Sequence, residues 1–171
     1  MKFFPSSKQI LKNNILLPTL YNDKSEIMSI EHVYPKCFLK ELHNNDFHNT
    51  FRASKFINNL RSNYMFSDIK NISWIHVSND NYISHKYKLF NPRNTDKGII
   101  ARAILYMNYK YDYKIIMCKD IIYKWCINYE PTFKEKLHNF YGYKIQGNYN
   151  PFISKFYDKN YIHFLKYTLE L

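Results

Sequence analysis

Apolar residues recur along the chain at the spacing of about 3.6 residues that marks one face of an α-helix. The stretch 54–65 follows this spacing from Phe56 to Tyr64, and Ser54 is a suitable N-cap residue for it. A longer and more strongly apolar stretch at 99–111 predicts a central helix. Further helices are predicted at 119–128, 132–145 and 160–169.

Strand signals are fewer than helix signals. Residues 29–34 alternate loosely and end at Pro35, which favours a strand that runs into a bend. Residues 72–77 give a second candidate strand, and residues 92–98 are typical of a loop. Residues 1–28 predict a lead-in with one short helix at most. The pattern therefore predicts a single helix-rich α+β domain with few strands.

The composition agrees with one folded domain. The chain has 171 residues, of which 46% are hydrophobic and 23% charged. The stretch most like a membrane span, 99–107, contains Arg102 and is far shorter than the ~18 apolar residues that a span needs. No secretory signal precedes the domain, so we expect an intracellular protein, unless a signal was removed. Abundant Lys, Asn, Ile, Tyr and Phe match AT-rich codons, which leaves a viral or host-cell compartment open.

Charge is the first clue to a partner. The chain has 25 Lys and Arg against 14 Asp and Glu, a net charge of +11. Such a surplus indicates a polyanion, with nucleic acid first and an anionic membrane surface second; a merely basic soluble protein is the alternative. No Lys-rich amphipathic helix favours the membrane. The three cysteines form no Cys-x-x-Cys pair, so they predict neither a disulfide framework nor a zinc motif.

Two short motifs bring together groups with acid–base and metal-binding chemistry. Glu31 and His32 are adjacent at the end of the first predicted strand. In a regular strand they would point to opposite faces, so they can serve one site only if the chain bends, as Pro35 favours. In the first predicted helix, Asn58 and Arg61 are three residues apart and share a face. An amide oxygen beside a guanidinium suits a hard cation and a phosphate.

Several segments carry a more specific signal because of their order. They are Glu-His-Val-Tyr-Pro at 31–35, Asp-Phe-His-Asn at 46–49, Asn-Asn-Leu-Arg-Ser-Asn at 58–63, Lys-Gly-Ile-Ile-Ala-Arg-Ala-Ile-Leu-Tyr-Met at 97–107 and Gln-Gly-Asn-Tyr-Asn-Pro-Phe at 146–152. Together they resemble the bacterial endonuclease I family, which are ββα-metal or His-Me finger nucleases. The resemblance implies such a finger at 29–66, after the lead-in at 1–28, with helical support from 67–171.

The resemblance also implies roles for the motif residues. Glu31 and Asn58 would hold Mg²⁺, at a site that Mn²⁺ or Ca²⁺ also suits. His32 would be the general base, and Arg61 a second catalytic group. The implied activity is Mg²⁺-dependent and largely sequence-nonspecific hydrolysis of DNA, with RNA left open, to 5′-phosphate and 3′-hydroxyl ends. We expect a monomer without a membrane partner, and no inhibitor or regulator is indicated.

The phosphate contact has several candidates, because some family members carry a longer insertion with an extra arginine. Here only residues 36–45 separate the first two motifs, so Lys36, Arg52 or Arg61 would have to contact the phosphate. Arg102 is either a further substrate contact or a buried ion-pair partner, and both remain open. The residues expected to give structural support are His48, Asn49, Gln146 and Asn148.

A second function remains to be weighed against the enzyme. The same scaffold could be a non-catalytic nucleic-acid-binding or packaging protein. The intact set of Glu31, His32 and Asn58 argues against this alternative, because a protein without catalysis is free to lose all three.

Overall fold

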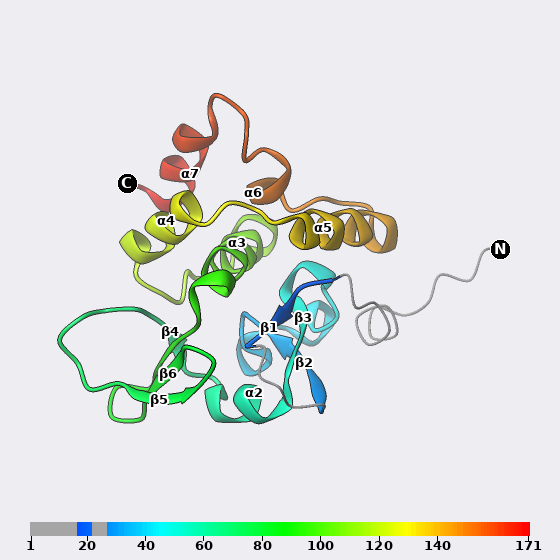
Figure 1. Ribbon diagram of the computed structural model, residues 1–171. Coiled ribbons are helices and arrows are strands. Elements are labelled where there is room, and N and C mark those ends of the chain that lie inside the picture. Colours follow the sequence, from blue (N-terminus) through cyan, green and yellow to red (C-terminus); the bar gives the residue numbers. More distant parts are fainter. Residues whose placement is uncertain (1–16, 22–26) are drawn as a thin grey trace.

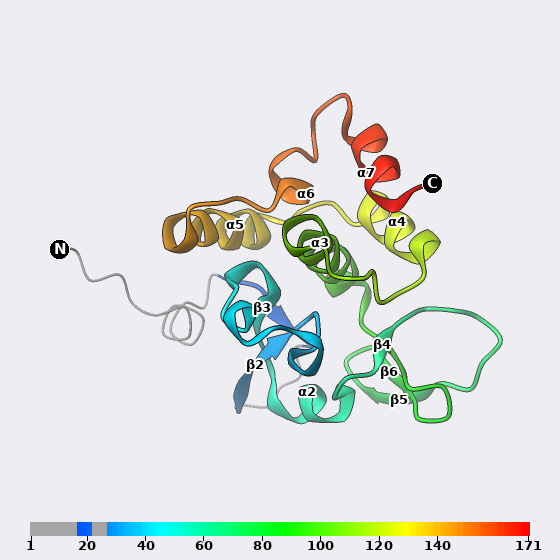
Figure 2. The ribbon, with the colours of Figure 1, turned by 180° about the vertical axis from the view of Figure 1, so that it is seen from behind.

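One long helix organises the molecule. The structure is a computed structural model that describes residues 17–21 and 27–171, so most of the lead-in predicted at 1–28 lies outside the described residues. In these residues, two small sheets and five other α-helices are arranged around α3 (Asn94–Tyr111). Figures 1 and 2 show the sheets below α3 and the later helices beside and above it. The α+β class expected from the sequence is confirmed.

Helix α3 is buried at every residue of the range Asp96–Met107. A helix that is apolar on all sides is expected in a core, and the predicted central helix is confirmed. It begins at Asn94, inside the loop predicted at 92–98. In the polar first turn Asn94 and Thr95 are exposed, whereas the Asp96 carboxylate is buried and accepts from Arg93 at both oxygens, each at 2.9 Å. The start of the helix was therefore not visible in the apolar pattern, because an ion pair rather than apolar side chains is buried at this end.

The first sheet contains the strand predicted at 29–34. Across the sheet the strands are β1 (Thr19–Leu20), β3 (Thr50–Ser54) and β2 (Met28–His32). Strands β2 and β3 are antiparallel over their full length, from the Met28–Ser54 pair to the His32–Thr50 pair. Three short 3₁₀ helices connect them: η1 (Lys36–Phe38), η2 (Glu41–His43) and η3 (Phe47–Asn49).

Helix α2 (Lys55–Arg61) follows β3 without a loop and completes a strand–strand–helix unit. The hydroxyl of Ser54 accepts a hydrogen bond from the Ile57 amide at 3.5 Å, so the predicted N-cap is confirmed. The helix ends at Arg61 instead of continuing to 65. Ser62 has φ 51°, a left-handed conformation that an α-helix cannot contain.

A second sheet corrects the helical support predicted for 67–171. Its strands, in order, are β4 (Met65–Phe66), β7 (Leu89–Asn91), β6 (Asn81–Ser84) and β5 (Ile75–Ser78). Of the strands predicted from the sequence, only the one at 72–77 belongs to this sheet, where it overlaps β5. Strands this short give little alternation to detect. The residue types at the tight turn between β5 and β6 do indicate a hairpin, because Asn and Asp tolerate positive φ. Asn79 and Asp80 have φ 46° and 60°, as a two-residue hairpin turn requires.

The helices predicted in the second half of the chain are confirmed. They are α4 (Lys119–Asn128), α5 (Phe133–Gln146) and α7 (Tyr161–Leu169), with an additional short α6 (Pro151–Ser154). Thr132 caps α5 by accepting from the Glu135 amide, and Gly147 ends it at φ 79°. Within the described ranges, no helix is long and apolar enough to cross a membrane.

Of the two roles left open for Arg102, a substrate contact and a buried ion-pair partner, the structure favours the ion pair. Its side chain is 1% exposed on α3 and donates to both carboxylate oxygens of Glu135 at 2.7 Å. A third donor reaches the Tyr129 carbonyl, also at 2.7 Å. Arg102 is therefore the buried ion-pair partner that joins α3 to α5, and it does not face a ligand.

The core also contains a buried histidine, His138, on the inner side of α5. The His138 ring stacks between Phe47 and Phe51, with centroids 4.3 and 4.4 Å away. Its Nε2 lies 2.8 Å from the Phe47 carbonyl, which can only accept, so this nitrogen carries the hydrogen. Burial lowers the pKa of His138 to about 3, and the nearby His48 adds to the effect. The ring is therefore neutral in the folded protein at neutral pH.

We expect this histidine to make the fold sensitive to acid. In the unfolded chain its pKa is about 6.5, so below that pH the unfolded state binds an additional proton. Its contribution to stability is complete above about pH 6.5 and falls by about 1.4 kcal/mol per pH unit toward pH ~3. Urea unfolding between about pH 4 and pH 7 measures the slope. His138→Gln should flatten it, leaving the smaller part due to His48, whose pKa burial also lowers. An unchanged slope would contradict this assignment.

Candidate active site

A pocket of about 340 Å³ lies where β2 ends, between η1 and α2. Five residues singled out from the sequence line it: Glu31, His32, Lys36, Asn58 and Arg61. Lys36 is exposed at this pocket. Arg52 is not part of it and lines a second pocket with Arg93 and Lys134. Arg52, one of the candidates for the phosphate contact, therefore does not lie at the pocket that contains Glu31 and His32.

The adjacent Glu31 and His32 share this pocket because the chain bends directly after them. Both residues pair regularly with β3, and bends follow at Val33 and Tyr34, before Pro35. The side chain of Asn49 holds the bend: its Oδ1 accepts from the Tyr34 amide at 2.7 Å, and its Nδ2 donates to the Tyr34 carbonyl. The bend expected from the sequence is confirmed, and the pocket forms around the end of the strand.

The Glu31 carboxylate is 2% exposed and is held at one oxygen. Its Oε1 accepts from Arg61 Nη1 at 2.8 Å and from the Tyr21 hydroxyl at 2.9 Å. Burial raises the pKa of Glu31, while the Arg61 charge and the Tyr21 hydrogen bond oppose the rise. Within the described part of the chain, Oε2 has no hydrogen-bond partner. This oxygen is the one left for a cation.

Arg61 faces inward and not toward a phosphate. Its side chain is 1% exposed, lies 4.3 Å from the centre of the Phe66 ring, and donates to the carbonyls of His32 and Val33 at 3.1 and 2.8 Å. With Glu31 as the third acceptor, Arg61 fixes both the carboxylate and the bend beyond β2. The phosphate contact predicted for Arg61 is corrected to a positioning role.

A hydrogen bond to a backbone carbonyl orients the His32 ring. Its Nε2 lies 2.8 Å from the Asn44 carbonyl oxygen. Because a carbonyl has no hydrogen to give, Nε2 must carry one. In the neutral ring the lone pair that can accept a proton is then on Nδ1. Tyr21 and Asn44 were not identified from the sequence: Tyr21 has no pattern around it, and any residue could supply the carbonyl.

The Asn58 amide is oriented by its nitrogen. Its Nδ2 donates to the Ser29 hydroxyl at 2.9 Å and to the Ile30 carbonyl at 3.3 Å. Since only the nitrogen can donate, the amide oxygen is the end that remains for a ligand. Glu31 and Asn58 thus bring one carboxylate and one amide oxygen to the same pocket.

This donor set fits Mg²⁺ better than a soft metal. Magnesium prefers oxygen ligands and is commonly bound by one or two carboxylates while it keeps several waters. Zinc sites typically use three or four Cys, His or acidic ligands. No group of three such residues that could hold a metal occurs in residues 17–21 and 27–171.

A buried polar network supports the loop that carries Asn44. At its centre, the Asp46 carboxylate accepts from Tyr106, Tyr111 and Gln146. The His48 ring nitrogen Nε2 lies 2.8 Å from the Asn148 carbonyl, and the Asn148 amide donates to Tyr106. A Cβ at Gly142 would lie 2.2 Å from His48, so α5 can approach only because this residue is glycine. His48, Gln146 and Asn148 all lie in this network, outside the pocket.

Comparison with known proteins identifies the class to which this fold and pocket belong. The curated Endonuclease-1 of Buchnera aphidicola subsp. Baizongia pistaciae is 30% identical over 118 residues, covering 67% of this chain and 48% of the relative. The extracellular deoxyribonuclease of Aeromonas hydrophila is 32% identical over 112 residues, covering 64% and 49%. The family model of Endonuclease I matches residues 12–156, so the chain belongs to the endonuclease I family. The chain spans about half the length of these two relatives.

The positioning role of Arg61 predicts a loss of stability, not only of activity. Arg61→Met should destabilise the fold by roughly 3–5 kcal/mol, because it leaves the Glu31 carboxylate buried without its counter-charge. Adding Glu31→Gln should recover part of this loss, since a neutral amide needs no counter-charge. Urea unfolding of both variants measures the difference. If Arg61→Met were as stable as wild type, the side chain would not be the internal partner seen here.

Proposed function

We propose that the chain is a divalent-metal-dependent endonuclease that hydrolyses DNA with little sequence preference. The observation that carries the proposal is the pocket at the end of β2, where an oriented imidazole, a carboxylate and an amide oxygen converge. Membership of the endonuclease I family and the names of two relatives agree with it. RNA cleavage, the product ends, the monomeric state and the intracellular location remain predictions. The name of the Aeromonas relative gives no support to the last of these.

In this proposal, Glu31 and Asn58 hold Mg²⁺. When bound, the ion neutralises charge on the scissile phosphate and on the departing 3′ oxygen. His32 Nδ1 accepts a proton from the attacking water, whose oxygen forms the new bond to phosphorus as the P–O3′ bond breaks. The departing 3′ oxygen takes up a proton from solvent water, so the ends that result are a 5′-phosphate and a 3′-hydroxyl. The Asn44 carbonyl keeps the ring in the tautomer that can accept this proton.

Substrate binding follows from charge. Lys36 is exposed at the pocket and can contact a phosphate there, whereas Arg61 is occupied internally. The net charge of +11 favours binding to the phosphate backbone of any nucleic acid, and contacts to the backbone alone carry no sequence information. The proposed enzyme therefore binds many sequences with similar affinity.

The proton acceptor is tested by His32→Ala. The change removes the base but no metal ligand, so the cleavage rate should fall by about 10²- to 10⁴-fold. Affinity for DNA in Ca²⁺ should stay close to that of wild type. Initial rates of plasmid nicking and anisotropy with labelled DNA give the two quantities, and His163→Ala on the exposed side of α7 is the control. Wild-type rates in His32→Ala would favour the non-catalytic binding protein instead.

The metal ligands are tested by a readout independent of cleavage. Titration calorimetry with Ca²⁺ or Mn²⁺ should show weaker binding for Asn58→Ala, because an oxygen ligand is lost. Asn58→Asp should retain binding, since it replaces an amide oxygen with a carboxylate. Asn59→Ala, at the exposed neighbour on the same helix, should match wild type. Equal affinity in Asn58→Ala and wild type would remove Asn58 from the site.

A further inference from the structure

The side of α5 that faces solvent consists of aromatic rings and lysines. Phe133, Lys136, Phe140, Tyr143 and Lys144 are exposed and follow helical spacing along one side. Phe133 is 75% exposed, which is high for a ring of this size. The opposite side of the helix packs against the core through Glu135, His138, Asn139 and Gly142.

Acidic groups are nearly absent from this surface, which we call the α5 outer face (Phe133, Lys136, Phe140, Tyr143 and Lys144). The single acidic residue of the helix, Glu135, is buried in its pair with Arg102. The exposed Glu130 precedes the helix and accepts from the Tyr157 hydroxyl at 3.2 Å. The charge on the α5 outer face itself is therefore entirely positive.

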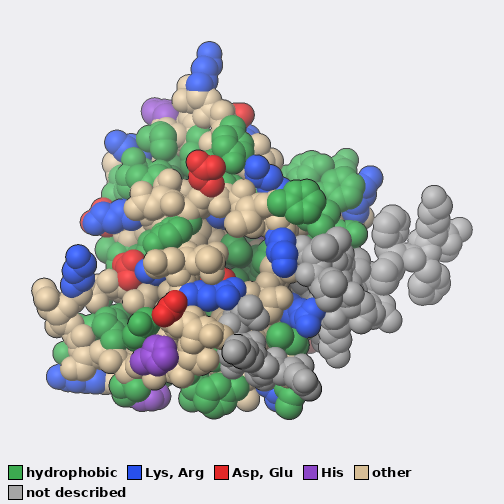
Figure 3. Space-filling model, viewed as in Figure 1, with side chains coloured by type: hydrophobic (Ala, Val, Ile, Leu, Met, Phe, Trp, Pro, Cys, Tyr) green, Lys and Arg blue, Asp and Glu red, His purple; other side chains and the backbone are tan. Residues whose placement is uncertain are grey.

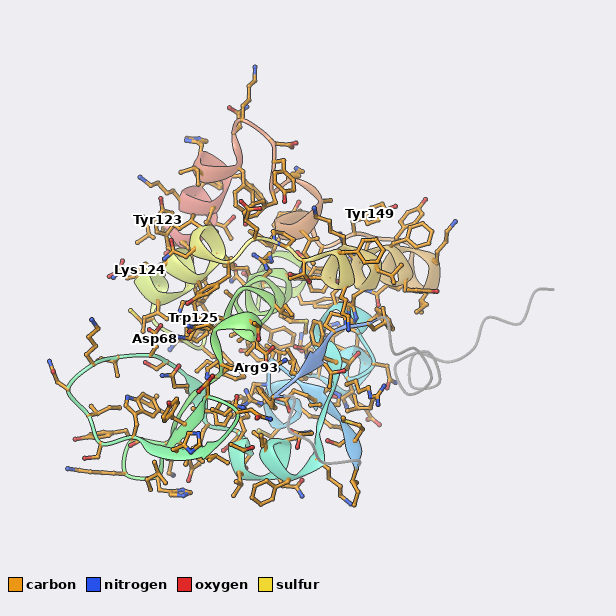
Figure 4. The ribbon with its side chains drawn as sticks, in the orientation of Figure 1. Asp68, Arg93, Tyr123, Lys124, Trp125 and Tyr149 are labelled. Atoms are coloured by element: carbon orange, nitrogen blue, oxygen red, sulfur yellow. The ribbon has the colours of Figure 1, made fainter. Side chains whose placement is uncertain are left out.

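Tyr149 and Tyr157, from the segment that follows α5, extend the α5 outer face. The rings of Tyr143 and Tyr149 are stacked, with centroids 4.4 Å apart and planes within 2° of parallel. Figure 4 shows Tyr149 over the outer side of α5, and Figure 3 shows hydrophobic and basic side chains gathered at this corner of the molecule. Tyr157 lies beside Lys136, whose ammonium is 4.6 Å from the ring centre. The ammonium groups of the lysines on this face thus lie next to exposed rings.

Such a surface selects a partner that is both planar and anionic. Bases of a single strand expose their π-faces and can continue a stack such as that of Tyr143 and Tyr149, while lysines contact the phosphates. Bases within a duplex are already stacked on their neighbours and expose only their edges in the grooves. We propose that the α5 outer face binds unpaired nucleotides of single-stranded nucleic acid. This inference rests on the proposed function, because it names the form of polynucleotide that the nuclease holds.

Binding of a labelled thymidine oligonucleotide of about 12 residues, within the usual range for single-strand sites, tests the inference in EDTA, where no cleavage occurs. The double variant Tyr143→Ala/Tyr149→Ala should lose about tenfold or more in affinity for this strand, as expected when a stacking position is removed. Affinity for a duplex of equal length should stay close to wild type. Tyr143→Phe/Tyr149→Phe keeps both rings and should bind like wild type, as should Tyr167→Ala, an exposed ring on α7.

Two outcomes would overturn the inference. One is an unchanged affinity of the alanine variant for the single strand, and the other is an equal loss of affinity for single strand and duplex. If the alanine variant is destabilised, Lys136→Gln/Lys144→Gln replaces it. That variant should lower the log–log salt slope for single strands by about 0.7 per lysine, and an unchanged slope would also count against the proposal.

Two further measurements distinguish a failure of this inference from a failure of the proposed function. If wild type fails to nick duplex DNA in Mg²⁺, the proposed function fails, while the oligonucleotide result in EDTA still decides the inference. If wild type nicks DNA and the alanine variant binds the single strand normally, only the inference fails. Vesicles containing phosphatidylserine test a membrane surface: vesicle binding lost in the alanine variant, with strand binding retained, would replace the nucleic acid by a lipid.

Discussion

The ion pair between Glu31 and Arg61 is the interaction on which the candidate active site depends. A carboxylate this deeply buried is unfavourable unless a cation and hydrogen-bond donors surround it, and Arg61 and Tyr21 supply both. The same guanidinium also holds the carbonyls of His32 and Val33. One side chain on α2 thereby fixes the carboxylate, the end of β2 and the bend that places two adjacent residues in one pocket.

The rest of the interior follows the same rule of paired burial. Among the described residues, the buried acids are Glu31, Asp46, Asp96 and Glu135, and the buried bases Arg61, Lys97 and Arg102. Two pairs form within this set, Glu31 with Arg61 and Glu135 with Arg102. Asp96 and Lys97 pair with the partly exposed Arg93 and Asp68. Asp46 is instead held by hydrogen bonds from tyrosines and an amide. The net charge of +11 is therefore carried almost entirely by the surface, where a polyanion can meet it.

The sequence predicts this molecule well where function or core packing leaves a periodic or ordered signal. The helices at 119–128, 132–145 and 160–169 have strong spacing and clear end signals, and the residues of the pocket stand in short motifs. Three of the four strands of the second sheet were missed because they are only two to four residues long. The partners of the site residues were missed for another reason. A backbone carbonyl such as that of Asn44 leaves no trace in residue type, and the inward turn of Arg61 depends on tertiary packing.

Helix α5 connects the base of the candidate site to the outer surface of the molecule. Its inner side meets η3 through His138 and Gly142, and its last residue, Gln146, binds Asp46, so it supports the loop whose Asn44 carbonyl orients His32. A helix held this firmly cannot easily shift or rotate. Its outer side therefore presents its rings from a fixed backbone, and a platform whose backbone is already ordered loses less entropy when a base stacks on it. The packing that orients the His32 ring thus also favours stacking on the opposite side of the same helix.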